Sequence, residues 1–296
     1  MQPGSVFVDE PIQVDYETAS LGPRALVWRT ERHEVTEVIR SWQDYRTPPY
    51  ANHARGWLHR RHRNYYLLRL SNGEVAEVYL DRAGGQRNWV LLKWQQLVLE
   101  LLTLGEWATN CYLLRCDDTA VIVDPAAEPD RILSALAGAR VAAILLTHGH
   151  PDHCQALSAI RDATHAPVMI HLDDMAAFNV QADLPLQHGA TVAIGYLSVR
   201  VVHTPGHTPG SVCLLFDQRA LVGDTLFPGG PGHTDTPEAL GTLLTTLTDN
   251  VFRWPDNTRF YPGHGPGSSI GEVRPAFARF LARPRPADLC GDLEWT

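Results

Sequence analysis

The strongest constraint on this chain is a cluster of histidine and aspartate residues that directly follows a short apolar run. Residues 141–146, Val-Ala-Ala-Ile-Leu-Leu, have the composition of a strand that is buried on both faces. They continue at once into Thr147-His148-Gly149-His150-Pro151-Asp152-His153. Because open α/β folds place their functional loops at the carboxyl ends of such strands, this loop is predicted to carry chemistry.

The spacing within the loop predicts metal binding. In an extended segment, side chains two residues apart point the same way, so His148 and His150 can face one ion. Pro151 ends the extended run, and Asp152 and His153 then begin a helix from which they can reach a second point nearby. Imidazole and carboxylate are the usual ligands of zinc and related divalent cations. Asp152 alone would be an ordinary helix N-cap, but three histidines with one aspartate in six positions favour the metal interpretation.

Three later loops each follow a predicted strand and each offer one more ligand. His207 lies in T-P-G-H-T-P-G-S after the strand 197–202, where proline and glycine fix the loop. Asp224 lies in G-D-T after the strand 220–222, and His264 lies in Y-P-G-H-G after the strand 259–261. One such loop is commonplace, whereas four of them after four strands point to a single site. His203, at the end of its strand, is interpreted as structural.

The two parts of the chain have different patterns. Residues 1–94 contain short alternating or aromatic-rich runs and a Ser71-Asn72-Gly73 turn signal, which predict a small all-β domain. These runs are residues 12–16, 25–30, 35–42, 65–70, 75–80 and 89–94. Residues 95–296 alternate strands with helices, which predicts two sheets flanked by helices. The helices are expected at 128–137, 152–163, 236–249 and 270–281.

From about residue 95 to 285 the chain resembles the metallo-β-lactamase-fold hydrolases, on the H-x-H-x-D-H motif and the later His, Asp and His. The resemblance implies an αββα sandwich with two metal ions at one edge. It implies that His148, His150 and His207 hold the first ion, that Asp152, His153 and His264 hold the second, and that Asp224 bridges both. Asp124, in Val-Asp-Pro after a strand, matches an aspartate that orients a ligand histidine in this superfamily. Residues 1–94 resemble a short β module of unknown function from bacterial proteins.

Within the superfamily, the runs around Asn110-Cys111-Tyr112 and Gly223-Asp224-Thr225-Leu226-Phe227 look most like the glyoxalase II group, which hydrolyses thioesters. The best-known β-lactamases have cysteine where Asp224 stands, so antibiotic hydrolysis is not expected. Only about thirty residues follow His264, whereas glyoxalase II has a helical glutathione-binding domain there. Related short enzymes read G-G-x-G-R-T-D after Phe227, and here His233 replaces the arginine. Phe227, His233 and Thr234 are the substrate-binding candidates, and the thiol carrier stays open.

The resemblance implies a hydrolase with two divalent cations, zinc first, although iron and manganese suit the same ligands. Two cations would turn a bridging water into hydroxide near neutral pH, and this hydroxide would attack the thioester carbonyl. Asp152 is the candidate for accepting or relaying the proton. The expected partner is therefore a small-molecule thioester, and a homodimer is left open. The runner-up is a mononuclear iron oxygenase of thiol persulfides, with the metal on His148, His207 and Asp224 alone.

A nucleic-acid phosphodiesterase is the third hypothesis, and the charge distribution argues against it. Residues 1–95 carry 13 basic and 11 acidic side chains, but residues 96–296 carry 12 and 22, and an acidic catalytic part repels phosphate backbones. A basic run at 53–63, near Trp57, Tyr65 and Tyr66, is interpreted as a solvated strand face.

The remaining composition predicts a cytoplasmic protein that does not enter membranes. The first ten residues lack a basic stretch followed by an apolar one, which argues against a secretory signal, and no apolar run could span a bilayer. The five cysteines form no C-x-x-C pair and fit reduced thiols. Cys154, next to His153, is interpreted as a small buried hydrophobe.

Overall fold

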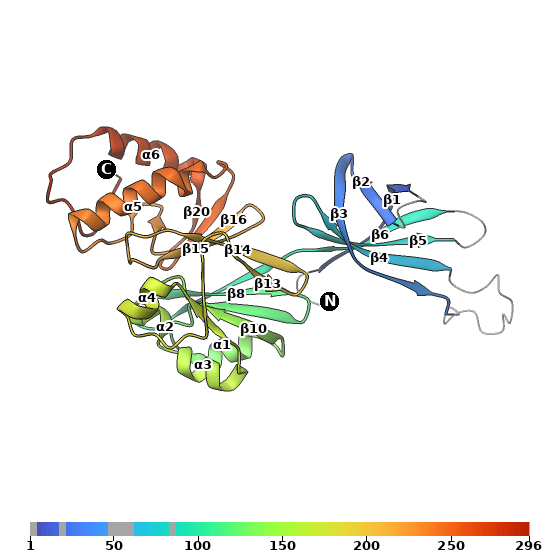
Figure 1. The fold of residues 1–296 in the computed structure, drawn as a ribbon, viewed down its shortest axis with the longest axis horizontal. Coiled ribbons are helices and arrows are strands. Elements are labelled where there is room, and N and C mark those ends of the chain that lie inside the picture. Colours follow the sequence, from blue (N-terminus) through green and yellow to red (C-terminus); the bar gives the residue numbers. More distant parts are fainter. Residues whose placement is uncertain (1–4, 18–21, 47–61, 83–86, 296) are drawn as a thin grey trace. The chain divides into compact units, whose positions relative to one another are not determined.

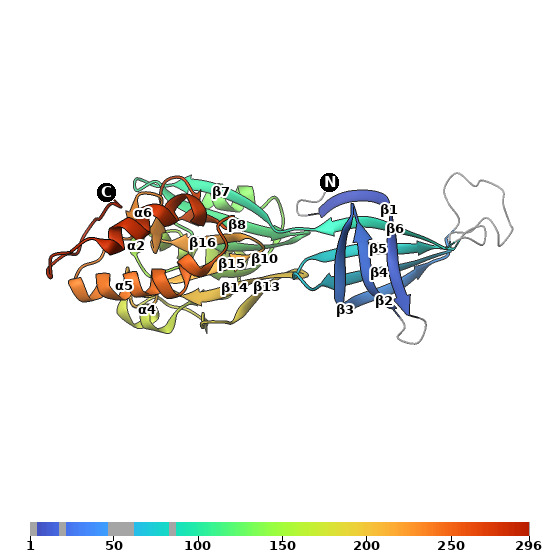
Figure 2. The same ribbon diagram turned by 90° about the horizontal axis from the view of Figure 1, so that it is seen from above.

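The computed structural model describes residues 5–17, 22–46, 62–82 and 87–295. The chain divides into two compact units, Met1–Leu97 and Val98–Thr296. Each unit is a separate body with its own core (Figures 1 and 2).

The first unit is a closed six-stranded antiparallel barrel. Its strands pair in chain order and the first pairs with the last; they are β1 (Ser5–Glu17), β2 (Gly22–Trp28), β3 (Glu31–Asp44), β4 (Arg63–Leu70), β5 (Val75–Asp81) and β6 (Asn88–Gln95). Closure removes exposed strand edges. Leu26, Leu68, Leu91 and Trp94 are among the side chains that fill its core. The turn between β4 and β5 contains Gly73, whose φ of +87° suits glycine.

The second unit contains two six-stranded sheets. The first sheet has the order β12-β11-β10-β9-β8-β7, and β9 to β12 run parallel. Its strands are β7 (Val98–Leu104), β8 (Thr109–Cys116), β9 (Thr119–Val123), β10 (Arg140–Leu145), β11 (Val168–Ile170) and β12 (Leu184–Pro185). The second sheet has the order β13-β14-β15-β16-β19-β20. Its strands are β13 (Thr191–Ile194), β14 (Leu197–His203), β15 (Val212–Phe216), β16 (Arg219–Gly223), β19 (Arg259–Pro262) and β20 (Ser268–Ser269).

Helices cover the outer faces of both sheets (Figure 1). The first sheet is covered by α1 (Pro129–Ala135) and α3 (Leu157–Thr164), and α2 (Pro151–Cys154) and α4 (Leu172–Ala177) lie at one end of it. The second is covered by α5 (Pro237–Asp249) and α6 (Ile270–Ala282), with a 3-10 turn at Val251–Arg253. A small ribbon of β17 (Leu226–Phe227) and β18 (Gly230–Pro231) completes the unit. The predicted αββα sandwich and the predicted small all-β unit are thus confirmed.

The apolar pattern explains the layers. β8 and β9 are buried along their whole length, as strands between a second sheet and a helical layer must be. One core lies between the second sheet and α5 and α6, and includes Leu243, Leu247 and Phe260. The other lies between the first sheet and its helices, and includes Ile132 and Ile160. Both cores hold the strand ends, and with them the site loops, in fixed places.

The helix that we predicted at residues 152–163 is two helices, α2 and α3. The backbone N–H of Ala156 donates to the carbonyl of Pro125 at 3.0 Å, so it leaves the helical hydrogen-bond ladder. Ala156 is thereby fixed against the loop after β9. The break separates α2, which begins in the predicted metal loop, from α3.

Candidate metal centre

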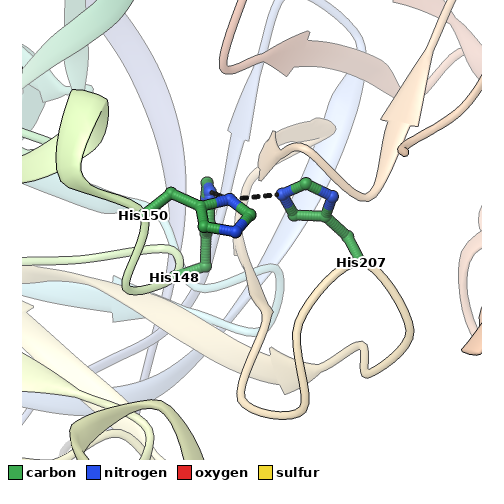
Figure 3. Close-up of side chains that lie close together, drawn as sticks. All are labelled: His148, His150 and His207. Atoms are coloured by element: carbon green, nitrogen blue, oxygen red, sulfur yellow. Dashed lines mark hydrogen bonds between the residues drawn. The ribbon is translucent and has the colours of Figure 1, made fainter. Parts of the chain in front are cut away.

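The first ligand group consists of His148, His150 and His207. Nε2 of His148 lies 3.1 Å from Nδ1 of His150, and Nε2 of His207 lies 2.9 Å from the same Nδ1. Figure 3 shows the three rings converging, two from the loop after β10 and one from the loop after β14. Ligands of one tetrahedral zinc at about 2.1 Å lie about 3.4 Å apart, so the three nitrogens fit a shared cation.

The second ligand group consists of Asp152, His153 and His264. Oδ2 of Asp152 lies 3.2 Å from Nε2 of His264 and 3.6 Å from Nε2 of His153. Asp224 lies between the two groups: its Oδ1 is 3.4 Å from Nε2 of His153, and its Oδ2 is 3.6 Å from His264 and 3.9 Å from His207. All seven predicted ligands therefore meet in one place, with one carboxylate shared between two groups.

Two buried polar atoms in this place fit the ligand set of a cation. Among the described residues, Nε2 of His153 and Oδ1 of Asp224 find no hydrogen-bond partner, although both are buried. Buried polar atoms normally have a partner, because leaving one without costs about 1–3 kcal/mol. Here the two atoms face each other and the other ligands, as they would around an ion.

The opposite ring nitrogens of four histidines fix the tautomers. Nδ1 of His207 lies 2.9 Å from the carbonyl of His233, and Nδ1 of His264 lies 3.1 Å from the carbonyl of Trp107. Since a carbonyl only accepts, these Nδ1 atoms carry the proton and leave Nε2 free to bind a metal. Nδ1 of His148 lies 3.1 Å from the hydroxyl of Thr147, and Nδ1 of His153 lies 3.0 Å from Asp124.

Asp124 organises the start of the predicted metal loop. Its Oδ1 accepts the backbone N–H of Thr147 at 2.7 Å, and its Oδ2 accepts both the Thr147 hydroxyl at 2.6 Å and Nδ1 of His153. The side chain is 1% exposed and the residue has a φ of +53°. Such backbone strain in a non-glycine residue is characteristic of functional sites. The orienting role of Asp124 stays a prediction, and the contacts it requires are present.

Glycine is required at two close approaches between the ligand loops. A Cβ on Gly263 would lie 2.1 Å from Oδ1 of Asp224 and 2.5 Å from Cε1 of His153. Gly223, with a φ of +48°, would place a Cβ 2.5 Å from the hydroxyl of Thr147. The glycines of the G-D-T and P-G-H motifs therefore allow the Asp224 and His264 loops to close on the first one.

The protonation of the metal-free site follows from burial and charge. Burial and the neighbouring histidines hold the pKa of His148 well below its usual value, so its ring is neutral and can bind a cation. Burial alone would lower the pKa of His153, but the charges of Asp124 and Asp224 outweigh it and raise that pKa to about 10. Burial raises the pKa of Asp152, but His264 and His153 lower it to about 2. Asp152 is therefore ionised at neutral pH, as a ligand must be, and its role in proton relay stays a prediction.

The three predicted substrate-binding residues lie in or beside the β17–β18 ribbon. Phe227 is half-buried, and Thr234 is buried with 1% exposure, so the Thr234 side chain contacts protein on all sides. His233 is exposed, and its two ring nitrogens lie 3.0 Å from Asp292 and 3.3 Å from Asp235. Two carboxylates thus already face His233, which makes it a poor site for a carboxylate of a substrate. The binding role of these residues stays a prediction.

Three residues of the site escaped the sequence interpretation. Trp107 is 70% exposed, and its carbonyl contacts His264. Phe178 packs edge-on against His150, with ring centroids 5.0 Å apart. Asp174 is buried and accepts hydrogen bonds from two of the ligand loops. Of the three, only Asp174 could have been identified from the sequence, because an aspartate pair soon after a strand end often has a functional or capping role.

A further histidine group does not form a metal site of the same kind. His171 and His203 stack with ring centroids 3.9 Å apart and an interplanar angle of 9°, beside Asp173. A metal ion bound by an imidazole nitrogen lies in the plane of that ring. Two stacked, nearly parallel rings therefore cannot both point at one ion. Nε2 of His203 also contacts the carbonyl of Pro209 at 2.9 Å. The structural role that we assigned to His203 stays a prediction.

Cys154 is half-buried, and burial raises the pKa of its thiol to about 11. It therefore carries little thiolate at neutral pH, in keeping with the predicted packing role. Most of the basic run at 53–63, including Trp57, lies outside the described residues. Among the helices of the described ranges, none is long and apolar enough to span a bilayer.

Comparisons with known proteins agree with the two-part architecture. The model of the metallo-beta-lactamase superfamily matches residues 104–264, and a domain of unknown function, DUF6504, matches residues 1–96. A hydroxyacylglutathione hydrolase of Anaeromyxobacter dehalogenans is 39% identical over 155 residues, which cover 52% of this chain and only 60% of that relative. A probable metallo-hydrolase, YqgX of Bacillus subtilis, is 32% identical over 204 residues, covering 60% of this chain and 93% of that relative.

Three solved structures with the same fold resemble this chain to a similar degree. ETHE1 from Myxococcus xanthus is 31% identical with a TM-score of 0.57, and the match covers 63% of this chain and 86% of that one. The B3 metallo-beta-lactamase BLEG-1 is 31% identical with a TM-score of 0.56, covering 59% of this chain and 95% of that one. TTHA1623 in a di-iron-bound form is 32% identical with a TM-score of 0.50, covering 58% and 96%. Because the family model spans more than half of the chain and the loops it covers converge on two metal-ligand groups, this chain belongs to the metallo-beta-lactamase superfamily of metallo-hydrolases.

Proposed function

We propose that this protein hydrolyses a small thioester of the hydroxyacyl-thiol type, with two divalent cations in the centre described above. The observation that carries the proposal is the set of ligands. Two groups of three share the Asp224 carboxylate, and all seven side chains bind through nitrogen or oxygen. The 39% identity to a hydroxyacylglutathione hydrolase supports the substrate class.

Two bound cations would supply the nucleophile and the electrophile, by lowering the pKa of a water between them and by polarising the substrate carbonyl. The residues of the chain have separate tasks. His148, His150 and His207 present three ring nitrogens, and burial keeps His148 neutral, while Asp152 and Asp224 add negative charge that would balance the cations. Asp124 holds His153 in place, so this part of the centre is preorganised before a substrate arrives.

The leaving group of a thioester needs little help from the protein. A thiolate departs at neutral pH without an acid placed beside it, because the pKa of a thiol is about 8.5. Neither serine nor cysteine is needed as a nucleophile, and burial raises the pKa of both Cys111 and Cys213. The centre can thus complete the reaction with water as the only second substrate.

The proposal leaves the identity of the thiol carrier open, because His233, which we expected to bind the carrier, already faces two carboxylates. His233 lies between Asp235 and Asp292, so an anionic carrier such as glutathione gains little there. A panel of acyl thioesters therefore needs anionic, neutral and cationic thiols. We expect turnover of at least one of them that depends on added zinc, iron or manganese. If every thioester is inert while a cephalosporin is cleaved, the proposal is wrong and the likeness to BLEG-1 extends to activity.

The second candidate is a mononuclear iron oxygenase that acts on thiol persulfides, favoured by the likeness of the run Gly229–Asp235 to the related short enzymes. If this chain were such an oxygenase, only His148, His207 and Asp224 would bind the metal. The position of His150 speaks for the hydrolase, because its Nδ1 is within 3.1 Å of both other histidines of the first group. Oxygen uptake with sulfite formation, together with one iron per chain, would replace the hydrolase by the oxygenase.

A further inference from the structure

Helix α4 contacts both loops that carry the first ligand group. The side chain of Asp174 in this helix is fully buried. Its Oδ2 accepts the backbone N–H of Gly149 and the hydroxyl of Thr208, both at 2.8 Å. Its Oδ1 accepts the backbone N–H of Gly210 at 2.6 Å. One carboxylate therefore joins the loop between His148 and His150 to the loop that follows His207.

The same helix is packed tightly against the backbone of both loops. A Cβ on Gly149 would lie 2.4 Å from Cδ2 of Phe178, the residue that ends α4. A Cβ on Gly210 would lie 2.6 Å from the backbone nitrogen of Asp174. The two glycines therefore let the loops approach the helix closely enough for their N–H groups to reach the carboxylate.

Further contacts of the same segment fix the ligands from the side. The ring of Phe178 stands edge-on to His150, with an interplanar angle of 82°. At the other end of the helix, His171 stacks on His203, and Nε2 of His203 contacts the carbonyl of Pro209 in the His207 loop. Residues 171–178 thus contact the first ligand group's loops at several points, and only Asp174 joins the two loops through one side chain.

We propose that Asp174 is a positioning residue for the first metal ion: it sets the distance between the His148–His150 pair and His207. The inference rests on the metal-dependent function proposed above, but it concerns ion binding and not the substrate. An aspartate fits the position because all of its partners donate hydrogens. Asparagine has one acceptor and one donor group, so at least one backbone N–H would face another donor, and the two loops would separate.

Replacing Asp174 is expected to affect the ion at the first ligand group and not the ion at the second. The second ligand group, Asp152, His153 and His264, makes no hydrogen bond to Asp174 among the described contacts. Asp174→Asn should therefore weaken ion binding at the first group by about tenfold to hundredfold, the range for lost partners of metal ligands. Binding at the second group should stay within about threefold of the unmodified protein.

The test is zinc titration of the full chain after chelator treatment, followed by anomalous diffraction at the zinc edge to assign each ion to its group. Asp173→Asn is the matched control, because it removes a carboxylate from the same helical turn at a side chain that is 55% exposed. Asp173→Asn should bind both ions as the unmodified protein does. Circular dichroism of the metal-free forms checks that each variant folds.

Thr208→Val provides a second, milder variant that removes one donor and keeps both backbone hydrogen bonds. It should weaken the first ion by a few-fold and leave the second unchanged. Unaltered zinc affinity in Asp174→Asn, or equal loss at both groups, would overturn the positioning role. A protein that binds both ions but cleaves no thioester would overturn only the proposed function, so the two failures are distinguishable.

Discussion

Gly263→Ala tests how closely the ligand loops must approach. An alanine Cβ at this position would lie 2.1 Å from Oδ1 of Asp224 and 2.5 Å from Cε1 of His153. Carbon and oxygen in ordinary contact are more than about 3.2 Å apart, so the Asp224 carboxylate or the His264 loop must move by about 1 Å. Neither neighbour is the free end of a flexible chain, because Asp224 and His153 both lie inside the ligand cluster.

A displacement of about 1 Å in a catalytic group can cost on the order of 100-fold in rate. We therefore expect kcat/KM of Gly263→Ala to fall by about 100-fold, equivalent to about 2.7 kcal/mol of transition-state stabilisation. Metal content should fall below two ions per chain. The added methyl should also destabilise the fold by about 1–3 kcal/mol, a normal cost of overpacking.

The assay combines thioester hydrolysis, elemental analysis and thermal unfolding. Gly241→Ala in α5 is the matched control, because a Cβ there meets nothing within 4 Å, and it should keep full activity. If Gly263→Ala retained two ions and unaltered kcat/KM, the packing of the three loops would not limit the geometry of the centre.

Three further outcomes are expected. Asp124→Asn should weaken metal binding by about tenfold to hundredfold in a chelator competition, since His153 and Thr147 lose their shared acceptor, and unchanged affinity would contradict the role of Asp124. Because the pKa of His153 is raised to about 10, its proton stabilises the metal-free protein below about pH 6.5 and this contribution is lost as pH rises through 10. Zinc affinity should accordingly rise about tenfold per pH unit across that window in calorimetry, and a flat profile would refute the assignment. Trp107→Ala should raise KM several-fold at constant metal content, since the indole is 70% exposed and its carbonyl contacts a ligand; an unchanged KM would exclude substrate contact.

Much of the fold was accessible from the sequence because the catalytic unit follows simple patterns. The apolar run before His148 is β10, and the glycine-rich loops with His207, Asp224 and His264 follow β14, β16 and β19. The barrel strands were recognised but their lengths were underestimated. β3 extends over Glu31–Asp44, beyond the predicted run at 35–42, and its mostly exposed or half-exposed side chains give little strand signal at the ends.

The contacts that organise the site were harder to predict, because they join segments distant in sequence. Helix α4 has six residues, too few to show a helical period in the sequence. The hydrogen-bond partners of Asp174 lie in loops 25 and 36 residues away. The break between α2 and α3 arises from a hydrogen bond to Pro125. His233 looked available for a substrate until the structure placed Asp292, 59 residues later in the chain, beside it.

The central claim is that one centre holds two cations through two ligand groups with Asp224 between them. Anomalous diffraction from this chain, purified without added metal and then equilibrated with zinc, tests this most directly. We predict two peaks per chain, one within ligand distance of His148, His150 and His207, and one within ligand distance of Asp152, His153 and His264. A single peak on His148, His207 and Asp224, with the second group empty at saturating metal, would contradict the account.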